Sequence, residues 1–343
     1  MRRRGSILIL VLFVMGVLSL LAMSFAYRAA LESRLASNRA IRAKLESQAA
    51  SAVAVALGRL RENTNDYDHP AEPWRVHGPL ATEGWLEDWG GNAKRAEAES
   101  VVDYQVIDEE GKLNVAYAPS VSLEKLGMSP QQIAGLFDWM DADDDSQADG
   151  AESDHYRSLP VPYRCKNGPL EMLDELLLVR GFGVADYRGE DADHDGELDP
   201  SENDGLASYP PDDADGQLRL GWVDLLTCMG DGHLNLNTAP LPVLCLLPLS
   251  EGAAEQIKRF VADGETSGDI ENHAFRSAKD IEQLQGLSDA DREVLKGIAA
   301  FKSEHFRIFA QAVHRPSGMR YQLEVLVRVS DGNAEILQWK AGH

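Results

Sequence analysis

The hydrophobic pattern begins with an uncharged apolar run from Ser6 to Tyr27, which follows three arginines and Gly5. From Arg28 to Asn63 the chain continues without proline and without glycine before Gly58. No turn signal interrupts this stretch, so we expect a single helix from Ser6 to Asn63. Such a helix is roughly 87 Å long at ~1.5 Å per residue.

The first part of this helix is long and apolar enough to cross a bilayer once. A cleaved signal peptide is the alternative, but the apolar run of about 22 residues exceeds the usual ~7–15, and no A-x-A-like site closes it cleanly. The arginines before the run are expected to hold the N-terminus in the cytoplasm and to send the rest of the chain across the membrane. We therefore predict a transmembrane segment at 6–27 and an amphipathic continuation at 28–63.

On this continuation, small and apolar residues recur at spacings of three and four, which places them on one face of the helix. They are Leu45, Ala49, Ala52, Ala56 and Leu60. Because alanine dominates the face, we expect a sheet or another helix to approach it closely.

Alternating patterns predict β-strands at both ends of the remaining chain. Val102, Tyr104 and Val106 alternate with polar residues, and so do the apolar residues at 321–329. Runs at 306–313 and 334–339 flank the second pattern beyond turn sequences, which predicts an antiparallel meander. The stretch at 64–99 holds prolines, glycines and tryptophans, and we expect an irregular covering loop there.

An internal repeat lies between these strands. The segment 111–119 returns as 232–240, and the same offset of 121 pairs Trp139 with Phe260. The offset then falls to 105, which pairs Leu176 with Ile281, so the first copy holds about 16 extra residues between its helices. We predict two similar small helical units of the SAM or helix-hairpin-helix kind, each entered through an Asn-rich turn that can cap a helix.

The charge balance excludes one class of partner. The 343 residues carry a formal net charge of −23, and the part after Tyr27 holds 30 basic and 56 acidic residues. A head this acidic repels phosphate backbones, and the predicted helical hairpins lack a basic rim, so we expect no nucleic-acid partner. Hydrophobic residues make up 44% of the chain, which is ordinary for a globular protein and unlike a disordered acidic tail.

One acidic loop has the spacing of a calcium site. The segment 191–202 places oxygen ligands at loop positions 1, 3, 5, 9 and 12, and Gly196 lies at the sixth position, where the backbone must turn sharply. Leu198 at the eighth position is expected to anchor the loop to a core. The alternative is a solvated acidic loop. The predicted ligands are Asp191, Asp193, Asp195, Glu197 through its backbone carbonyl, Asp199 and Glu202.

A second acidic loop lies in the extra segment of the first unit and repeats this spacing, with Ser146 in place of the glycine. Its predicted ligands are Asp141, Asp143, Asp145, Asp149 and Glu152, with Asp138 or Asp154 as further candidates. A third cluster at 212, 213 and 215 either completes a site or makes a turn. In each loop calcium would neutralise carboxylates that repel one another, so the energy of binding would become energy of folding.

The sequence shows no G-x-S-x-G, H-E-x-x-H or P-loop motif, and its nine histidines are scattered, so we expect no enzyme. The three cysteines have no metal-binding spacing, and their odd number excludes a complete disulfide framework. Cys228 and Cys245 lie among apolar residues and are predicted to be core thiols.

Several short motifs, taken in order, resemble the type II secretion minor pseudopilin K family over nearly the whole chain. Arg4-Gly5 precedes Ser6, and Asp138-Trp139 leads into the acidic run at Asp141. The other motifs are Asp108–Asn114, Pro162–Arg164 with Asn167–Leu170, Glu175-Leu176 with Val179–Phe182, and Leu234–Pro240. Each motif is weak alone, and the ordered set is specific.

The resemblance implies an α+β, type IV pilin-like fold. A long N-terminal helix is half-buried against an antiparallel sheet, and a large α-helical insertion binds structural Ca²⁺, here at two sites. A prepilin peptidase is expected to cut between Gly5 and Ser6, and the new N-terminus is a methylation site. Major pseudopilins carry a glutamate five residues into the mature chain, where this chain has Leu10. That difference fits the K type at the filament tip, because a carboxylate in lipid is unfavourable without a partner.

The resemblance further implies a non-enzymatic subunit at the tip of the type II secretion pseudopilus, which supports filament assembly and protein export across the outer membrane. The chain would be a single-pass inner-membrane protein with its head in the periplasm. Expected partners are other minor pseudopilins, with secreted cargo and the outer-membrane secretin as further candidates. The alternatives are a membrane-anchored, calcium-dependent binding module and the tip subunit of a related type IV filament system.

These interpretations divide the chain into seven parts. They are a prepilin leader at 1–5, the transmembrane segment at 6–27, the amphipathic helix at 28–63, a loop with the first strands at 64–110, an inserted calcium-binding helical domain at 111–231, a second helical unit at 232–303, and C-terminal antiparallel strands at 304–343.

Overall fold

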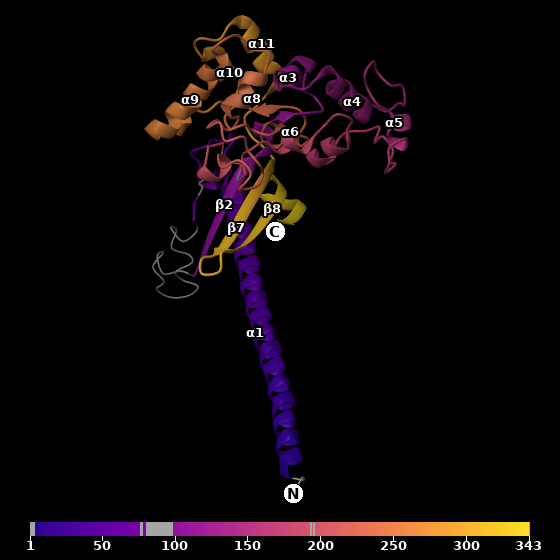
Figure 1. The fold of residues 1–343 in the computed structure, drawn as a ribbon. Helices are drawn as coiled ribbons and strands as arrows, with labels where there is room; N and C mark the ends of the chain where they lie inside the picture. Colours follow the sequence, from indigo (N-terminus) through magenta and orange to yellow (C-terminus); the bar gives the residue numbers. More distant parts are fainter. Residues whose placement is uncertain (1–3, 76–77, 80–98, 193, 195, 343) are drawn as a thin grey trace.

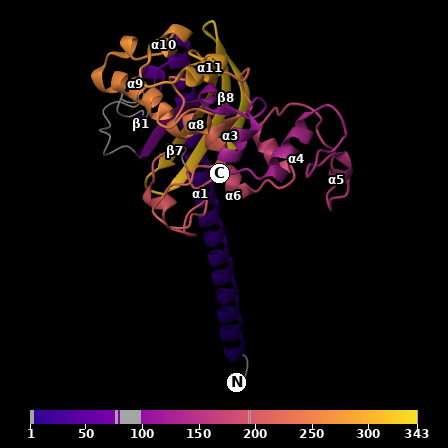
Figure 2. The ribbon, with the colours of Figure 1, turned by 90° about the horizontal axis from the view of Figure 1, so that it is seen from above.

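A long N-terminal helix carries a head made of one antiparallel sheet and a group of short helices (Figures 1 and 2). The computed structural model describes residues 4–75, 78–79, 99–192, 194 and 196–342. The sheet packs on the upper part of the helix, and the short helices lie at the end of the head opposite the free end of that helix (Figure 1).

The helix α1 (Arg4–Glu62) confirms the prediction of one uninterrupted helix. Its first part is long and apolar enough to cross a membrane, with a mean hydropathy of 2.7 over 18 residues, none of them buried. Farther along, the predicted face is buried against the sheet: Leu45, Ala49, Ala52, Ala56 and Leu60, joined by Val53. The small alanine side chains allow the helix backbone to lie close to the strands.

This close approach makes α1 sensitive to added volume. Ala52 is fully buried, whereas Ala54, two residues on, is exposed. We expect Ala52→Leu to destabilise the head by about 1–3 kcal/mol, because a well-packed interface cannot accept extra methylenes without strain. The matched Ala54→Leu should change stability by less than about 0.5 kcal/mol. Denaturant unfolding followed by tryptophan fluorescence measures both, and equal effects would contradict the packing described here.

The sheet joins strands from both ends of the head in the order β1-β2-β7-β8-β9, with every neighbouring pair antiparallel. The strands are β1 (Gly78–Pro79), β2 (Ser100–Asp108), β7 (His305–His314), β8 (Met319–Ser330) and β9 (Asn333–Gly342). Val102, Tyr104 and Val106 lie in the core that α1 covers. The predicted strand and meander are therefore confirmed.

The predicted covering loop is described only in part. The 3-10 helix η1 (Pro73–Arg75) inserts the buried Trp74 against Phe306, with ring centroids 5.3 Å apart. Trp85 and Trp89 lie outside the described residues.

The two copies of the repeat fold alike. The offset of 121 relates α3 (Ser120–Lys125) to α8 (Leu241–Leu246) and brings α4 (Pro130–Met140) into line with α9 (Ala253–Ser267). The offset of 105 relates η4 (Leu173–Leu178) to α10 (Ala278–Gln283) and aligns the starts of α6 (Val184–Arg188) and α11 (Asp289–Ile298). Each copy also closes with a parallel two-residue strand pair. These pairs are β3 (Leu113–Asn114) with β4 (Leu226–Thr227) and β5 (Leu234–Asn235) with β6 (Ala299–Ala300).

The two copies share a single hydrophobic core, which is separate from the core between α1 and the sheet. The first copy also has an insertion that the repeat did not predict. In the second copy α11 runs directly into β6, whereas the first copy places residues 189–225 between α6 and β4. The acidic loop 191–202 is therefore an insertion within the first copy. This region also holds the 3-10 helix η5 (Pro200–Glu202) and α7 (Trp222–Leu225).

Buried charges join the sheet to the helical part of the head. Glu109, in the 3-10 helix η3 (Glu109–Gly111), accepts from Arg307 Nε of β7 at 2.7 Å and from Lys112 Nζ at 3.1 Å. Thr227 Oγ1 donates to the same carboxylate at 2.7 Å. Arg307 also pairs with Glu324 of β8. The motif Asp108–Asn114 is therefore the junction between the two cores.

A second polar cluster at this junction surrounds Asp108. Its Oδ2 accepts from Thr238 Oγ1 at 2.6 Å and from Ser303 Oγ at 2.7 Å, and Asn235 Nδ2 donates to both Asp108 and Asp68. Burial raises the pKa of Asp108 to about 7, and the neighbouring Asp68 adds to this effect. The motif at 234–240 thus supplies hydrogen-bond donors to a buried carboxylate.

The cysteine prediction is partly wrong. Cys245 is exposed and Cys228 is only partly buried, whereas Cys165 is the buried thiol. An apolar sequence neighbourhood did not place Cys245 in the core, because it lies on the outer side of the short helix α8.

Candidate metal centre

Three carboxylates of the first helical copy converge on one point. Asp138 lies in the last turn of α4, Asp141 follows the end of that helix, and Glu152 precedes α5 (Ser153–Arg157). One oxygen of each lies within 4.8 Å of the others. Asp138 and Glu152 are buried, with exposed fractions of 0% and 5%.

Two of the three carboxylates have oxygens that lack the donors a buried anion requires, whereas Asp138 accepts from the backbone of Gln147 at 3.2 Å. Both oxygens of Glu152 and Oδ1 of Asp141 are buried without a hydrogen-bond donor among the described residues. Burial raises the pKa of Glu152 to about 7, and the nearby Asp138 and Asp141 also act to raise it. Burial, followed by repulsion from Asp143, raises the pKa of Asp141 as well. A cation between these groups would remove the repulsion and satisfy the oxygens.

The backbone approaches this centre closely at Gly150. A Cβ atom at that position would overlap the Asp138 carboxylate, which would have to move away. Asn167 lies nearby and donates from Nδ2 to the Asp143 carbonyl at 2.6 Å, while its Oδ1 is buried without a donor among the described residues. Asn167 is a candidate that the sequence analysis missed, because it lies 15 residues beyond the acidic loop.

The other predicted ligands of this loop do not join the three carboxylates. Asp143, Asp145 and Asp149 are exposed, and Asp143 Oδ1 accepts from the backbone of Asp145 at 2.8 Å. Asp154, a further candidate, is exposed as well. The structure therefore brings together Asp138, Asp141 and Glu152, and a metal role for the exposed residues stays a prediction.

In the loop 191–202 two predicted ligands are buried at its ends. Asp191 accepts from the backbone of His194 at 2.6 Å and of Gly196 at 3.0 Å. Glu202 accepts from the backbone of Ala192 at 2.7 Å and of Asp199 at 3.0 Å. The two carboxylates thus close the loop around its own backbone. Burial raises the pKa of Asp191 to about 6, and Asp224 contributes to the shift.

Among the described residues, none of the other predicted ligands of this loop is buried. Asp193 and Asp195 lie outside the described residues, and Glu197 and Asp199 are exposed. The expected anchor is wrong, because Leu198 has an exposed fraction of 38%. The loop is anchored instead by His194, whose ring stacks on Phe309 of β7 at 4.8 Å between centroids and whose carbonyl accepts from Gln105 of β2 at 2.9 Å.

The third acidic cluster acts as a turn in this structure. Asp212 accepts from the backbone of Asp204 at 3.0 Å, of Gly205 at 2.9 Å and of Ala214 at 2.7 Å. Its carboxylate thereby ties two loop segments of the insertion together. The insertion is closed at its base by Glu190, which accepts from Arg219 Nε at 3.3 Å.

The fold defines a class of protein. A search of solved structures finds a chain of the crystal structure of the GspK–GspI–GspJ complex from the enterotoxigenic Escherichia coli type 2 secretion system. The match has a TM-score of 0.53 and covers 90% of this chain and 99% of that one, at 14% sequence identity. At this identity the likeness concerns the fold alone. The protein is thus type IV pilin-like, with a large helical insertion.

Sequence comparisons find relatives that share one description. A family model described as type II secretion system (T2SS), protein K, matches residues 122–189, which cover the first helical copy from α3 to α6. Type II secretion system protein K of Klebsiella pneumoniae is 28% identical over 200 residues, covering 54% of this chain and 60% of the relative. The protein of the same name from Pseudomonas aeruginosa is 28% identical over 287 residues, covering 75% and 72%. The chain is thus similar in sequence to type II secretion system protein K.

Proposed function

We propose that this chain is a non-enzymatic minor pseudopilin at the tip of the type II secretion pseudopilus. The observation that carries the proposal is α1, a helix that can cross a membrane over its first part and packs on a pilin-like sheet over its last part. Filament subunits of this class pack through such helices. We propose two smaller minor pseudopilins as partners, in line with the three-protein complex of the structural neighbour.

Leu10 supports a position at the tip of the filament. The side chain is exposed in the isolated chain, and it stands where major pseudopilins have a glutamate. A glutamate in lipid needs the amino terminus of a neighbouring subunit as its partner, whereas leucine needs none. A subunit with leucine here is therefore suited to the tip. The arginines before the run favour an inner-membrane anchor with the head in the periplasm, where the subunit would support export across the outer membrane.

Calcium is proposed as a structural ion of the helical part. The support is that carboxylate oxygens of Asp141 and Glu152, beside the buried Asp138, have no hydrogen-bond donor among the described residues. Hard oxygen ligands of this kind suit Ca²⁺, which takes six to eight of them. A second ion is proposed for the loop 191–202, where Asp191 and Glu202 are candidate ligands. The ions would hold the two insertions of the first copy in place.

Processing of the N-terminus tests the filament role. In a host with a prepilin peptidase, the mature chain is expected to begin at Ser6, as measured by intact-mass spectrometry. Gly5→Glu should leave the leader uncut and reduce secretion at least tenfold, because an uncut subunit keeps its arginines on the cytoplasmic side. Ser6→Ala serves as the matched control and should still be cut. A variant such as Gly16→Glu is unsuitable as a control, because it places a charge in the membrane.

The alternatives give different results in the same experiment. A membrane-anchored binding module keeps its N-terminus intact and binds its partner without the smaller pseudopilins. A tip subunit of a related filament system is processed, but it does not restore secretion in a bacterial strain whose type II secretion protein K has been deleted. An intact N-terminus in the mature protein would contradict any filament role.

A further inference from the structure

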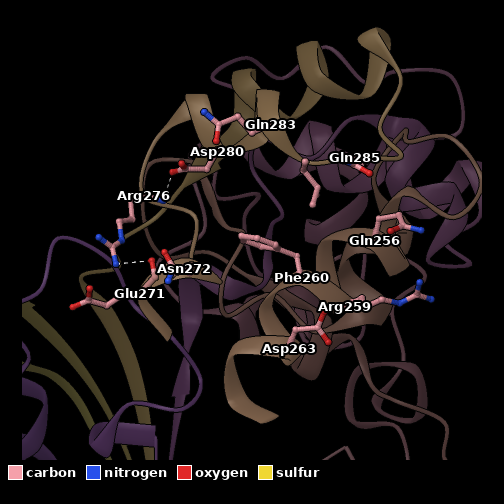
Figure 3. Close-up of a pocket in the computed structure, with 12 residues that line it drawn as sticks. Gln256, Arg259, Phe260, Asp263, Glu271, Asn272, Arg276, Asp280, Gln283 and Gln285 are labelled. Atoms are coloured by element: carbon pink, nitrogen blue, oxygen red, sulfur yellow. Dashed lines mark hydrogen bonds between the residues drawn. The ribbon is translucent and has the colours of Figure 1, made fainter. Parts of the chain in front are cut away.

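A cleft of about 560 Å³ lies in the second helical copy, between α9, α10 and the 3-10 helix η6 (Ile270–Asn272). These helices are at the end of the head opposite the free end of α1 (Figure 1). In the close-up, the ring of Phe260 lies across the middle of the cleft, with Asp280 and Gln283 on one side and Asp263 on the other (Figure 3). The volume falls in the range of ligand-binding pockets.

The first copy of the repeat shows how the equivalent space is filled there. Trp139 stands at the position of Phe260, 121 residues earlier. Tyr156 and Tyr163 pack on Trp139 with ring centroids 5.1 and 6.2 Å away, and the two tyrosine rings stack at 5.2 Å. Both tyrosines lie between α4 and η4, the interval in which the first copy holds its extra residues. Trp139 is buried as a result, whereas Phe260 is only half-buried.

The tyrosine hydroxyls also bind backbone groups whose counterparts line the cleft. Tyr163 donates to the Leu178 carbonyl at 2.7 Å, and Tyr156 accepts from the Arg180 N–H at 3.3 Å. At the offset of 105 these positions correspond to Gln283 and Gln285. Both glutamines line the cleft beside Phe260. The second copy therefore has residues at the receiving positions but no inserted segment that supplies the tyrosines. Phe260 packs there on Phe275 and His273 of its own copy, with ring centroids 4.8 and 5.6 Å away.

We propose that the cleft binds a tyrosine-bearing loop of a second polypeptide, with the tyrosine ring packed on Phe260. The rim suits a polypeptide, because its amide, carboxylate and guanidinium groups offer the donors and acceptors that a peptide backbone needs. The cleft also lies at the end of the head opposite the free end of α1 (Figure 1). The partner is a protein that meets the distal end of the head.

The natural probe is the segment that fills the equivalent site in the first copy. A labelled peptide with the sequence of residues 155–164 contains both tyrosines. We expect saturable binding to the full-length protein in detergent micelles with Ca²⁺, measured by fluorescence anisotropy. Replacing both tyrosines by alanine should weaken binding at least tenfold. Replacing them by phenylalanine should weaken it less, because the rings remain and only the hydroxyl hydrogen bonds are lost.

Variants of the protein locate the peptide. Gln283 is exposed on the rim, so Gln283→Trp fills the cleft without disturbing the core, and it should weaken binding at least tenfold. Glu255 is exposed on α9 outside the lining, so Glu255→Trp should leave affinity within twofold. Absence of saturable binding would overturn the inference. Unchanged binding to Gln283→Trp would overturn it too, since the peptide would then occupy its own site in the first copy.

Discussion

Chelation of calcium with EGTA is expected to lower the melting temperature of the full-length protein in detergent micelles by roughly 5–10 °C. A site held at about one hundred times its dissociation constant adds about 2.7 kcal/mol to the free energy of unfolding. In a domain of this size each kcal/mol corresponds to about 2–4 °C. Differential scanning fluorimetry at pH 8, with Ca²⁺ or with EGTA, measures the shift, and an unchanged melting temperature would contradict structural calcium.

Glu152→Gln distinguishes the stability that comes from ion binding from the stability of the ion-free fold. With Ca²⁺ the variant should melt below the wild type, because one charged ligand is lost. With EGTA the variant should melt at the same temperature as the wild type or above it. The pKa of Glu152 is raised from 4.5 to about 7 by burial, so the ion-free fold loses stability as pH rises between these values, and at pH 8 the wild type holds an unfavourable buried charge. Glutamine removes that charge.

The control for this substitution is Glu124→Gln on α3, which removes an exposed carboxylate outside the centre. Its melting temperature should follow the wild type with and without the ion. If Glu152→Gln retains the full chelation shift of the wild type, then Glu152 is not a ligand and the ion lies elsewhere.

The regular elements were predictable because each follows a period in the sequence. The alanine face of α1 and the alternation in β2 and β8 state which side is buried, and the structure agrees. The helical copies were predictable for another reason. Two segments with the same sequence pattern fold alike, so the matched offsets gave the pairing of α3 with α8 and of η4 with α10 before any contact was known.

The candidate site was only partly predictable, because the loop spacing does not say which carboxylates meet. Asp138 reaches the centre from the last turn of a helix, and Gly150 makes room for it through a close backbone approach. The exposed Leu198 shows that an apolar residue in a loop need not be anchored, since much of a protein surface is apolar.

The ion pair of Arg307 could not be predicted from the sequence, because its partner Glu109 lies 198 positions away. Its position in β7 could be read from the alternation of that strand, with Phe306 and Ile308 facing α1 and Arg307 facing the other side. A single sequence does not reveal what covers that other side. The structure shows that the buried carboxylate of η3 lies there.

Arg307→Met is expected to lower the free energy of unfolding by about 3–5 kcal/mol, because it leaves Glu109 buried with Lys112 as its one remaining charged partner among the described residues. Burial alone would raise the pKa of Glu109, but Lys112 and Arg307 hold this pKa well below its ordinary value. The stabilisation by the pair is therefore present above the unfolded pKa of 4.5 and is lost as pH falls below it. The difference in free energy of unfolding between wild type and variant should therefore decrease as the pH is lowered.

A surface pair of the same kind provides the control. Arg328 of β8 lies 2.7 Å from Glu304, and both side chains are about half exposed, at 49% and 42%. Arg328→Met should change the free energy of unfolding by less than about 1 kcal/mol, because solvent screens the pair. The double variant Glu109→Gln with Arg307→Met should not recover the loss in full, since Lys112 then stays buried without an acidic partner among the described residues. Denaturant unfolding at pH 7.5 measures all three. Equal effects of the two arginine substitutions would show that the junction between the sheet and the helical part does not depend on this buried pair.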